Sequence, residues 1–384
     1  MRPTTGAPAQ SGPGTAPVTP VADLNRWGRT AHPVPERMTA VVLTRHGGPE
    51  ALEVRHDVPT PKLADDQVLV AVAAAGMNNT DVWSREGGYG TAGDPSAVGG
   101  WRGVPLDFPR VQGGDIAGRI VGVGARVDPA RLGERVLVDG ALYDSDSPHA
   151  NAVGLLGSER DGGFAQFAAV EARRAHDVGA SPLSDRELAA LPIAYGTAVG
   201  MLERVGLAPG ERVLVTGASG GVGLALVQLA RARGCTVVAV TTADKRDQVA
   251  AAGADRVLER GAVPREHLDA PVDVVADVVG GPAFPDLVDA LGEGGRLVTA
   301  GAIAGAEITL DIRRLYLHTR RIVGSAMWTP AHYDRLVEEA RRGAFAPVIA
   351  DTYPLAEIGA AQRAFAEKRF VGKLVLDVPP AAAG

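Results

Sequence analysis

The first part of the chain has no regular pattern of hydrophobic and polar positions. Residues 1–36 are rich in Pro, Gly, Thr and Ala and show no apolar periodicity. Such a segment cannot bury enough apolar surface to offset the entropy lost on ordering, so we expect a disordered tail over 1–36. It also lacks the apolar stretch of a secretory signal peptide.

Short strand-like runs, separated by Gly, Pro and Asp, follow this tail. β-branched and apolar residues gather in the runs, as they do in the strands of a compact β-rich domain. We predict this domain over 37–183. Its predicted strands are Thr39–Leu43, Gln67–Ala73, Gly118–Val123 and Arg135–Val138.

From residue 184 onward, strand-like runs alternate with amphipathic helices. The clearest helix is predicted over Val222–Arg233, with Gly234 as its C-terminal cap. This alternation is typical of a parallel sheet that is covered by helices on both faces, and we predict it over 184–327. The predicted strands are Arg212–Val215, Thr236–Val240, Arg256–Leu258, Val272–Ala276, Arg296–Thr299 and Arg321–Gly324.

The last segment, 328–384, is too long to be an extension of the parallel sheet. It contains a further predicted helix over Pro330–Arg342 and the strand-like run KLVLDV at 373–378. We expect this segment to return to the first domain. The predicted fold class is therefore α/β: a β-rich domain with a doubly wound parallel-sheet domain inserted into it, which 384 residues are long enough to build.

Composition and charge narrow the function classes. The chain is 46% hydrophobic and 22% charged, with a formal net charge of −6, which is ordinary for a globular protein and not basic enough for a nucleic-acid partner. No apolar run approaches the roughly 20 residues that span a bilayer. The single cysteine, Cys235, excludes an internal disulfide and a multi-cysteine zinc cluster. We expect a cytoplasmic protein with a small-molecule substrate and no membrane partner.

A glycine-rich turn, TGASGGVG at 216–223, joins the run ERVLV to the apolar VGLALVQLA. Such a turn lets backbone N–H groups approach a pyrophosphate, and the start of the following helix adds partial positive charge. The turn alone fits both a Rossmann fingerprint, A-x-G-x-x-G, and the T-G-x-x-x-G-x-G form of short-chain dehydrogenases. The candidate cofactor-binding residues in it are Thr216, Ala218, Ser219, Gly220, Gly221, Val222 and Gly223.

The order of the domains disfavours the short-chain family. In those enzymes the glycine motif lies near the N-terminus and a Tyr-x-x-x-Lys pair follows, but neither Tyr195 nor Tyr316 has a lysine four residues later. From about Met38 to Val378 the chain instead resembles the medium-chain dehydrogenase/reductase superfamily, in its zinc-free quinone oxidoreductase (zeta-crystallin-like) branch. The matching stretches, in family order, are MTAVVLTRHGGPEALEV, AGMNNTDVWSREGGY, VQGGDIAGRIVGVG, GERVLV, LPIAYGTAVGML, TGASGGVGLALVQLARARG and RFVGKLVLDV.

This resemblance implies a GroES-like catalytic domain and an inserted Rossmann domain. It also implies a homodimer, because in relatives the strand that matches RRIVGSA at 320–326 pairs with its twofold mate. An uncovered edge strand favours such pairing.

The resemblance also bears on a catalytic zinc. Zinc-containing members use a Cys in C-H-T-D, a His in G-H-E, and a Cys or His upstream of the nucleotide turn; the matching positions here are Asn78, Gly114 and Ile193. Glycine and isoleucine have no ligating side chain, so we expect no metal. Lone histidines such as His149 and His318 are interpreted as surface or core residues.

Without a metal Lewis acid, reduction of an activated C=C bond is easier than oxidation of an alcohol, since an enolate oxygen needs only hydrogen-bond donors. The zinc-free relatives reduce quinones, enones and enoyl thioesters. The resemblance thus implies NADPH-dependent reduction of a quinone or an α,β-unsaturated carbonyl. Two alternatives stay open: an enoyl-thioester reductase acting on CoA- or carrier-bound chains, and a non-catalytic nucleotide-binding accessory protein.

The end of the second parallel strand bears on the cofactor. NAD enzymes usually place Asp or Glu there, whereas this strand ends at Thr241 and is followed by Lys245 and Arg246. This favours NADPH, with Lys245 as counter-ion of the 2′-phosphate, as in zinc-free relatives; the alternative is that both cations are solvated surface charges. We interpret Asp244 as a helix N-cap. Lys373, in the ending RFVGKLVLDV, is a further candidate cofactor-binding residue.

Three side chains are candidate catalytic residues. By resemblance, Asn78 faces the substrate and could donate to a carbonyl oxygen, and Thr197 lies against the nicotinamide; the alternatives are an Asx cap and a helix-interior threonine. Tyr89 follows the flexible EGG and is a candidate pocket residue or proton donor. Trp101, in a loop over 91–109 that is longer than in the family, is the candidate substrate-lining aromatic residue.

Overall fold

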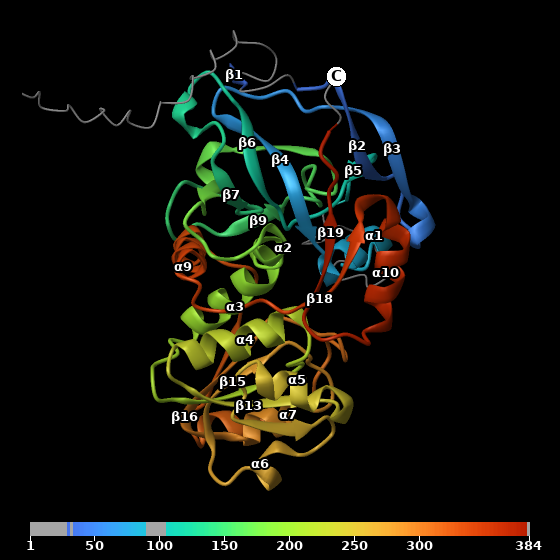
Figure 1. Cartoon of the computed structure of the whole chain (residues 1–384). Coiled ribbons are helices and arrows are strands. Elements are labelled where there is room, and N and C mark those ends of the chain that lie inside the picture. The colour runs from blue at the N-terminus through green and yellow to red at the C-terminus, as the bar shows by residue number, and fades with distance from the viewer. Residues whose placement is uncertain (1–28, 31–33, 90–104, 382–384) are drawn as a thin grey trace, which may run out of the picture.

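The computed structural model describes residues 29–30, 34–89 and 105–381. Two sheet regions lie at opposite ends of the molecule, with helices α3 (Pro192–Arg204) and α4 (Gly221–Ala232) between them (Figure 1). One region is β-rich and the other is a parallel sheet with helices. The predicted α/β class is therefore confirmed.

The β-rich region is built on an eight-stranded sheet with the order β11-β7-β6-β4-β19-β18, to which β1 and β10 add by pairing with β6 and β4. Its longest strand, β4 (Gln67–Gly76), alternates over its first residues: Val68 and Val70 pack into one core cluster, while Leu69 packs into another on the opposite face. Small sheets β3-β2-β5 and β8-β9 flank it. The other strands are β1 Arg29–Thr30, β2 Arg37–Leu43, β3 Leu52–Pro59, β5 Arg110–Val111, β6 Ala117–Val123, β7 Arg135–Val138, β8 Ala141–Tyr143, β9 Ala152–Leu155, β10 Phe167–Glu171, β11 Ala175–Asp177, β18 Ile349–Pro354 and β19 Lys373–Asp377.

The second region is a six-stranded parallel sheet with the order β14-β13-β12-β15-β16-β17. In its central strands, β12 and β15, the runs 213–215 and 274–276 are apolar and fully buried, as expected when helices cover both faces. Strand β16 begins at Leu291, five residues before the predicted start at Arg296. The strands are β12 Arg212–Val215, β13 Thr236–Thr241, β14 Arg256–Glu259, β15 Val272–Asp277, β16 Leu291–Thr299 and β17 Arg321–Gly324.

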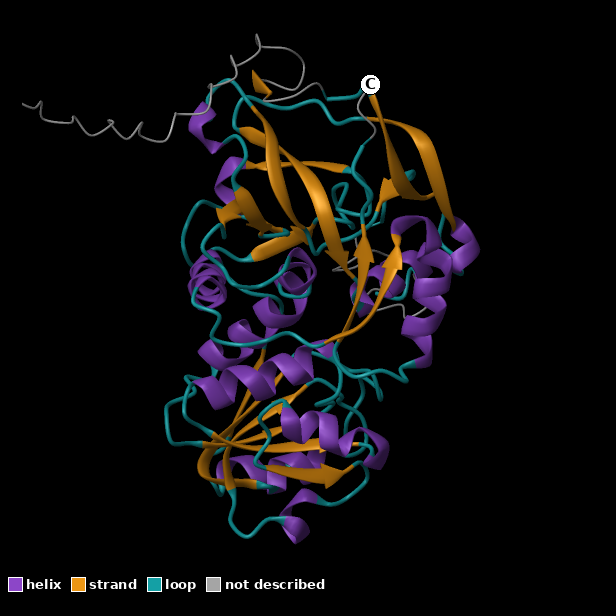
Figure 2. Cartoon of the chain, in the orientation of Figure 1, coloured by secondary structure: helices purple, strands orange, loops and turns teal. Residues whose placement is uncertain are grey.

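The helices lie mainly around the parallel sheet and between the two regions (Figure 2). Helix α2 shows how local sequence sets a boundary: Ser184 accepts from the Glu187 N–H, and the Glu187 carboxylate accepts from the Ser184 N–H. Within the described ranges, none of the helices has the length and apolar character needed to cross a bilayer. The remaining helices are α1 Asn79–Glu86, α2 Asp185–Ala189, α5 Arg246–Ala251, α6 Pro264–His267, α7 Phe284–Asp289, α8 Arg313–Tyr316, α9 Pro330–Arg341 and α10 Ile358–Glu367.

The end of the chain returns to the β-rich sheet, as predicted. Strand β19 pairs antiparallel with β4, with Val375 opposite Gly76, and parallel with β18 on its other side. At the other end of the chain, Arg29 and Thr30 form β1 against β6, within the predicted disordered tail. Backbone pairing does not depend on apolar side chains, so composition could not reveal this strand. Residues 1–28 and 31–33 of that tail lie outside the described residues.

Candidate active site

A cleft of about 750 Å³ is lined by residues from both regions. The β-rich region contributes the start of α1 and the residues around the start of β19. The parallel sheet contributes the turn between β12 and α4 and the loops that follow β13, β14 and β15. These loops all leave the carboxyl ends of parallel strands, which is where open α/β sheets bind their ligands.

The glycine-rich turn has little room for side chains. Gly217 has a φ of +56°, in the left-handed region that favours glycine. A Cβ on Gly223 would lie only 2.2 Å from the Gly217 carbonyl oxygen. Ala218 is fully buried and its N–H donates to the Val240 carbonyl, so it anchors the turn to β13 and does not line the cleft. The other predicted turn residues do line it: Thr216, Ser219, Gly220, Gly221, Val222 and Gly223.

Two cations lie near the ends of neighbouring strands. Lys245, predicted from the sequence, lines the cleft, and its Nζ donates to the Lys368 carbonyl over 2.5 Å. Arg260, which sequence reasoning missed, follows β14, lines the same wall and makes no side-chain hydrogen bond or ion pair among the described residues. Burial lowers the pKa of Lys245, and the nearby Arg260 charge adds to that shift. Asp244 is not the predicted N-cap, because a 3-10 turn precedes α5 and Lys245 holds that position.

This wall fits a dinucleotide. It offers exposed backbone at the turn, the N-terminus of the twelve-residue helix α4, and two cations. The predicted Thr241 also lines the cleft, and its buried hydroxyl has no hydrogen-bond partner within the described part of the chain. On the opposite side of the turn, the Thr216 hydroxyl donates to Asp277 at the end of β15 over 2.6 Å.

Across the cleft, Asn78 belongs to a buried polar cluster. Its Oδ1 accepts from the Lys373 Nζ at 2.6 Å, and its Nδ2 donates to the Asp115 carboxylate at 2.8 Å. Lys373 also donates to the Met77 carbonyl at 2.7 Å and to Asp115 at 3.0 Å. Asp115 accepts the Ile193 N–H as well. Both ends of the Asn78 amide are thus held, Asn78 lines the cleft, and its second amide hydrogen has no partner among the described residues.

Lys373 connects this cluster to the nucleotide turn. A Cβ on Gly221 would lie 2.9 Å from the Lys373 Cδ, so the lysine stem passes directly beside the turn. The preceding N–H, of Gly372, donates to the Ser219 carbonyl at 2.9 Å. Lys373 therefore contacts the turn through its stem, while its ammonium group is directed at Asn78 and Asp115.

The positions that match zinc ligands do not fit a zinc ion. A Cβ on Gly114 would lie 2.7 Å from the Ile193 Cδ1, so an apolar side chain occupies the space beside that position. The Lys373 ammonium is hydrogen-bonded to Asn78, and a divalent cation there would face a fixed positive charge. Among the described residues, no group of three or more His, Cys, Asp and Glu side chains could hold a metal.

Asp81 holds the backbone before α1. Its Oδ2 accepts from the Asn78 N–H at 2.7 Å. Burial raises the pKa of Asp81 to about 7, and the neighbouring Asp115 contributes in the same direction. The folded protein therefore binds this proton more tightly than the unfolded chain does.

This difference predicts a pH dependence of stability. Because the Asp81 pKa rises from about 4 in the unfolded chain to about 7 on folding, its contribution to the free energy of unfolding should fall as the pH rises through that interval. Asp81→Asn keeps an acceptor oxygen without the charge and should flatten the decline. Urea unfolding of both proteins at pH 5 and pH 8 measures it. Equal slopes in the two proteins would contradict the assignment.

The other predicted catalytic residues also line the cleft. Thr197 does so from α3, and Tyr89 from the turn after α1. The Tyr89 ring lies edge-on to Trp83, with centroids 5.5 Å apart. Burial raises the pKa of Tyr89 to about 12, so its hydroxyl is neutral and can donate a proton. Trp101 lies outside the described residues.

One large aromatic residue that lines the cleft, Trp328, was not predicted from the sequence. Trp328 lines the cleft from the linker after β17, and a Cβ on Gly196 would lie 2.7 Å from its ring. The only sequence feature that points to this contact is Gly196, because a helix glycine without a side chain leaves room for a large neighbouring ring. Phe365, Phe370 and Lys368 are further lining residues that the sequence did not predict.

Comparisons with known proteins agree with this architecture. The family model of the alcohol dehydrogenase GroES-like domain matches residues 64–180, and the zinc-binding dehydrogenase model matches 221–342. The acryloyl-coenzyme A reductase of Metallosphaera sedula is 31% identical over 348 residues, which cover 88% of this chain and 99% of that protein.

Two solved structures extend the likeness. A candidate alcohol dehydrogenase from Sinorhizobium meliloti 1021 has a TM-score of 0.86 and 48% identity, over 90% of this chain and 98% of its own. The 2-octenoyl-CoA carboxylase reductase CinF, in complex with NADP and 2-octenoyl-CoA, has a TM-score of 0.78 and 29% identity, over 92% and 90%. With a GroES-like domain, a Rossmann domain and relatives matched over nearly their whole length, the chain belongs to the medium-chain dehydrogenase/reductase superfamily of oxidoreductases.

Proposed function

We propose that the protein is a zinc-independent, NADPH-dependent oxidoreductase that reduces a C=C bond conjugated with a carbonyl group, in a quinone or an α,β-unsaturated carbonyl compound. The observation that carries this proposal is the Asn78 amide. It is held at both ends by Lys373 and Asp115 and retains one N–H for the cleft.

The residues of the chain suit the charge changes of this reaction. When bound, the nicotinamide supplies a hydride to the β-carbon, and the π electrons move to the carbonyl oxygen. In this proposal the second Asn78 N–H, which has no partner among the described residues, stabilises the resulting enolate oxygen. The Lys373 ammonium at its Oδ1 polarises the amide and strengthens that donor. Tyr89, neutral and half-buried, is the candidate donor of the proton to the α-carbon, and solvent then replaces that proton.

The relatives favour one special case as a second candidate, an enoyl thioester substrate. Acryloyl-coenzyme A reductase and CinF are both named for CoA thioesters. A thioester carbonyl would use the same Asn78 donor, so the site chemistry does not separate the two substrates. A non-catalytic nucleotide-binding protein is the third possibility and would bind NADPH without turnover.

Oxidation of NADPH by a panel of acceptors tests these functions. The panel contains 1,4-benzoquinone, 2-cyclohexenone, 2-octenal and crotonyl-CoA, and we expect steady oxidation with at least one of them. Asn78→Ala should lower kcat by about 100-fold, as expected for loss of an oxyanion donor. Asn79→Ala is the matched control, since this neighbouring amide accepts from Lys368 outside the cluster. NADPH binding with no oxidation by any acceptor would refute the enzymatic proposal.

Zinc independence gives a separate prediction. Because Asn78, Gly114 and Ile193 do not form a ligand set, the purified protein should contain no stoichiometric zinc, and its activity should resist chelators. Elemental analysis before and after treatment with EDTA measures this. One zinc per chain, lost together with activity, would contradict the prediction.

We further propose a homodimer through the edge strand β17. This strand pairs with β16 on one side only within the described sheet. Eight large hydrophobic side chains are exposed among the described residues, and six of them lie between 303 and 322, in the segment that leads into β17; of these, Ile303 lines the cleft. An exposed edge next to apolar side chains favours pairing with a second copy. The six are Ile303, Ile308, Ile312, Tyr316, Leu317 and Ile322.

Ile322→Lys should weaken this dimer. Each copy would bury one unpaired charge at the seam, which should raise the dissociation constant by about 100-fold or more. Light scattering over a dilution series measures the change. Val153→Lys is the matched control, since Val153 is 44% exposed against 38% for Ile322 but lies on β9. A dimer that persists unchanged in Ile322→Lys would refute the seam.

A further inference from the structure

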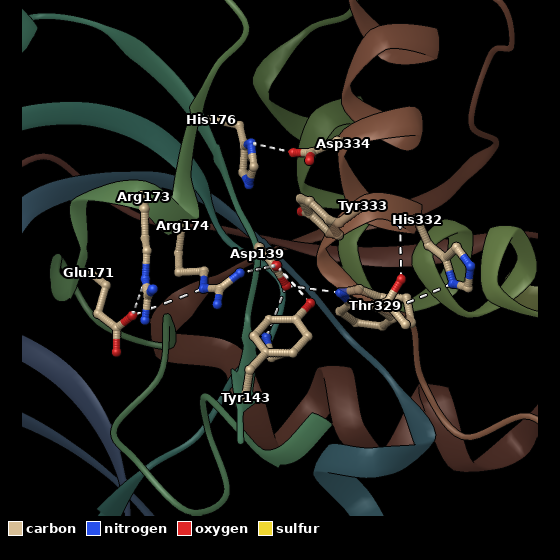
Figure 3. A network of polar contacts seen from close by, with 12 residues as sticks. Asp139, Tyr143, Glu171, Arg173, Arg174, His176, Thr329, His332, Tyr333 and Asp334 are labelled. Carbon is tan, nitrogen blue, oxygen red and sulfur yellow. Dashed lines mark hydrogen bonds and ion pairs between the residues drawn. The ribbon is translucent and has the colours of Figure 1, made fainter. Parts of the chain in front are cut away.

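A second buried carboxylate, Asp139, lies directly after β7 in the β-rich region. Its side chain is 0% exposed and accepts four hydrogen bonds (Figure 3). Oδ1 accepts from the Trp328 Nε1–H at 2.9 Å and from the Ala141 N–H at 3.1 Å. Oδ2 accepts from the Tyr143 hydroxyl at 2.8 Å and from the Arg174 guanidinium at 3.5 Å.

A buried carboxylate is costly, and an apolar residue could fill the same volume. Three of its donors come from the same region of the chain. The fourth, Trp328, comes from the linker that leaves the Rossmann domain, 189 residues away in sequence. The only one of these hydrogen bonds that reaches a distant part of the chain is therefore the one that fixes the Trp328 indole.

Trp328 is held on its other sides by packing. Its ring lies against Gly196, where a Cβ would come within 2.7 Å, and beside the Tyr333 ring, with centroids 5.7 Å apart. Tyr333 in turn donates its hydroxyl to the Val138 carbonyl, next to Asp139. Trp328 lines the cleft although only 1% of its surface is exposed. One polar contact, to Asp139, fixes the direction of the indole N–H.

The residue after Asp139 shows where Trp328 lies relative to Asn78. A Cβ on the next residue, Gly140, would lie 2.6 Å from the Gly114 carbonyl oxygen and 3.5 Å from the Leu155 Cδ1. Gly114 precedes Asp115, which bonds Asn78. Through Asp139 and Gly140, Trp328 is thus connected to the segment 114–115 that holds Asn78.

We infer that Asp139 is a positioning residue for Trp328, and that the fixed indole restricts the size of the group that a substrate can carry on the β-carbon of the reacting double bond. This inference rests on the proposed reduction of enones. It assigns a specificity-determining wall to Trp328 and makes Asp139 its anchor, although Asp139 does not line the cleft itself.

Two enones that differ by one group test the inference. They are 3-buten-2-one and 4-phenyl-3-buten-2-one, which carries a phenyl group on the β-carbon. Asp139→Ala should lower the preference for the smaller enone by about 10-fold, mainly through KM, as expected when one wall of a pocket loses its position. Asp139→Asn keeps an acceptor for the indole and should restore the preference. In a Trp328→Phe background, Asp139→Ala should cause no further change in the preference.

A control variant and a measurement without substrate distinguish failure of the Asp139 anchor from failure of the proposed function. Tyr143→Phe removes a different hydrogen bond to the same carboxylate and should lower thermal stability without changing the preference. Near-ultraviolet circular dichroism, as the difference from Trp328→Phe, reports the Trp328 signal, which Asp139→Ala should lose and Asp139→Asn should keep. If no acceptor of the panel is reduced, the proposed function fails, while this signal still tests the anchor. An unchanged Trp328 signal in Asp139→Ala, or an equal effect of Asp139→Ala in the Trp328→Phe background, would overturn the inference.

Discussion

Lys373→Met is expected to lower kcat by about 100-fold and to destabilise the fold by about 3–5 kcal/mol. The substitution keeps an unbranched stem beside the nucleotide turn but removes the ammonium group. Asp115 is then a buried carboxylate without its cation, and Asn78 loses the donor at its Oδ1. Denaturant unfolding and steady-state kinetics measure the two effects separately.

Two further variants separate stability from catalysis. Lys373→Met combined with Asp115→Asn removes the uncompensated charge, so stability should recover while kcat stays low. Full recovery of kcat in this double variant would show that Asn78 does not depend on Lys373. Arg186→Met is the control. It breaks an exposed ion pair with Asp377, which lies on β19 like Lys373, and should change the free energy of unfolding by no more than about 1 kcal/mol.

The second large effect is expected in cofactor selectivity. Lys245→Ala should weaken NADPH binding by about 10-fold or more, since one charge-assisted pairing contributes about 1.5–3 kcal/mol. NADH has no 2′-phosphate, so its affinity should change little. Because Arg260 lies on the same wall, the double variant Lys245→Ala, Arg260→Ala should favour NADH over NADPH. Fluorescence titration with each cofactor measures the dissociation constants.

The adjacent cation provides the control. Arg246 follows Lys245 in sequence but does not line the cleft; its guanidinium donates to the Val257 carbonyl at 2.8 Å. Arg246→Ala should therefore leave the ratio of the two affinities unchanged. If Lys245→Ala weakens NADPH and NADH equally, Lys245 is not the residue that discriminates between them.

The strands were predictable where their patterns are local. Arg135–Val138, Arg212–Val215 and Arg321–Gly324 are strands with the predicted bounds, because each is a short β-prone run between polar or glycine residues. The return of the last segment was expected because 328–384 is too long to be an extension of the parallel sheet. The order of β19 between β4 and β18 was not, because strand order depends on contacts that a single sequence does not display.

The site residues also fall into two groups, those that belong to sequence motifs and those that do not. The glycine turn, Lys245 and Asn78 carry motifs with fixed spacing, and the structure brings all of them to one cleft. Arg260 and Trp328 have no motif, because each reaches the cleft through the packing of distant segments. Arg260 could have been anticipated from one rule, that the ends of neighbouring parallel strands meet at one edge of a sheet. Trp328 could be predicted only if the residue that packs against Gly196 were known.

The position of β19 has a consequence for biosynthesis. Residues 373–377 lie inside the β-rich sheet and pair on both sides, whereas the Rossmann sheet uses only residues between 212 and 324. Domains generally fold as units while the chain emerges from the ribosome. We therefore expect the second domain in sequence to fold first, and the β-rich domain to stay incomplete, with the β4 edge open, until residues 373–377 have left the ribosome.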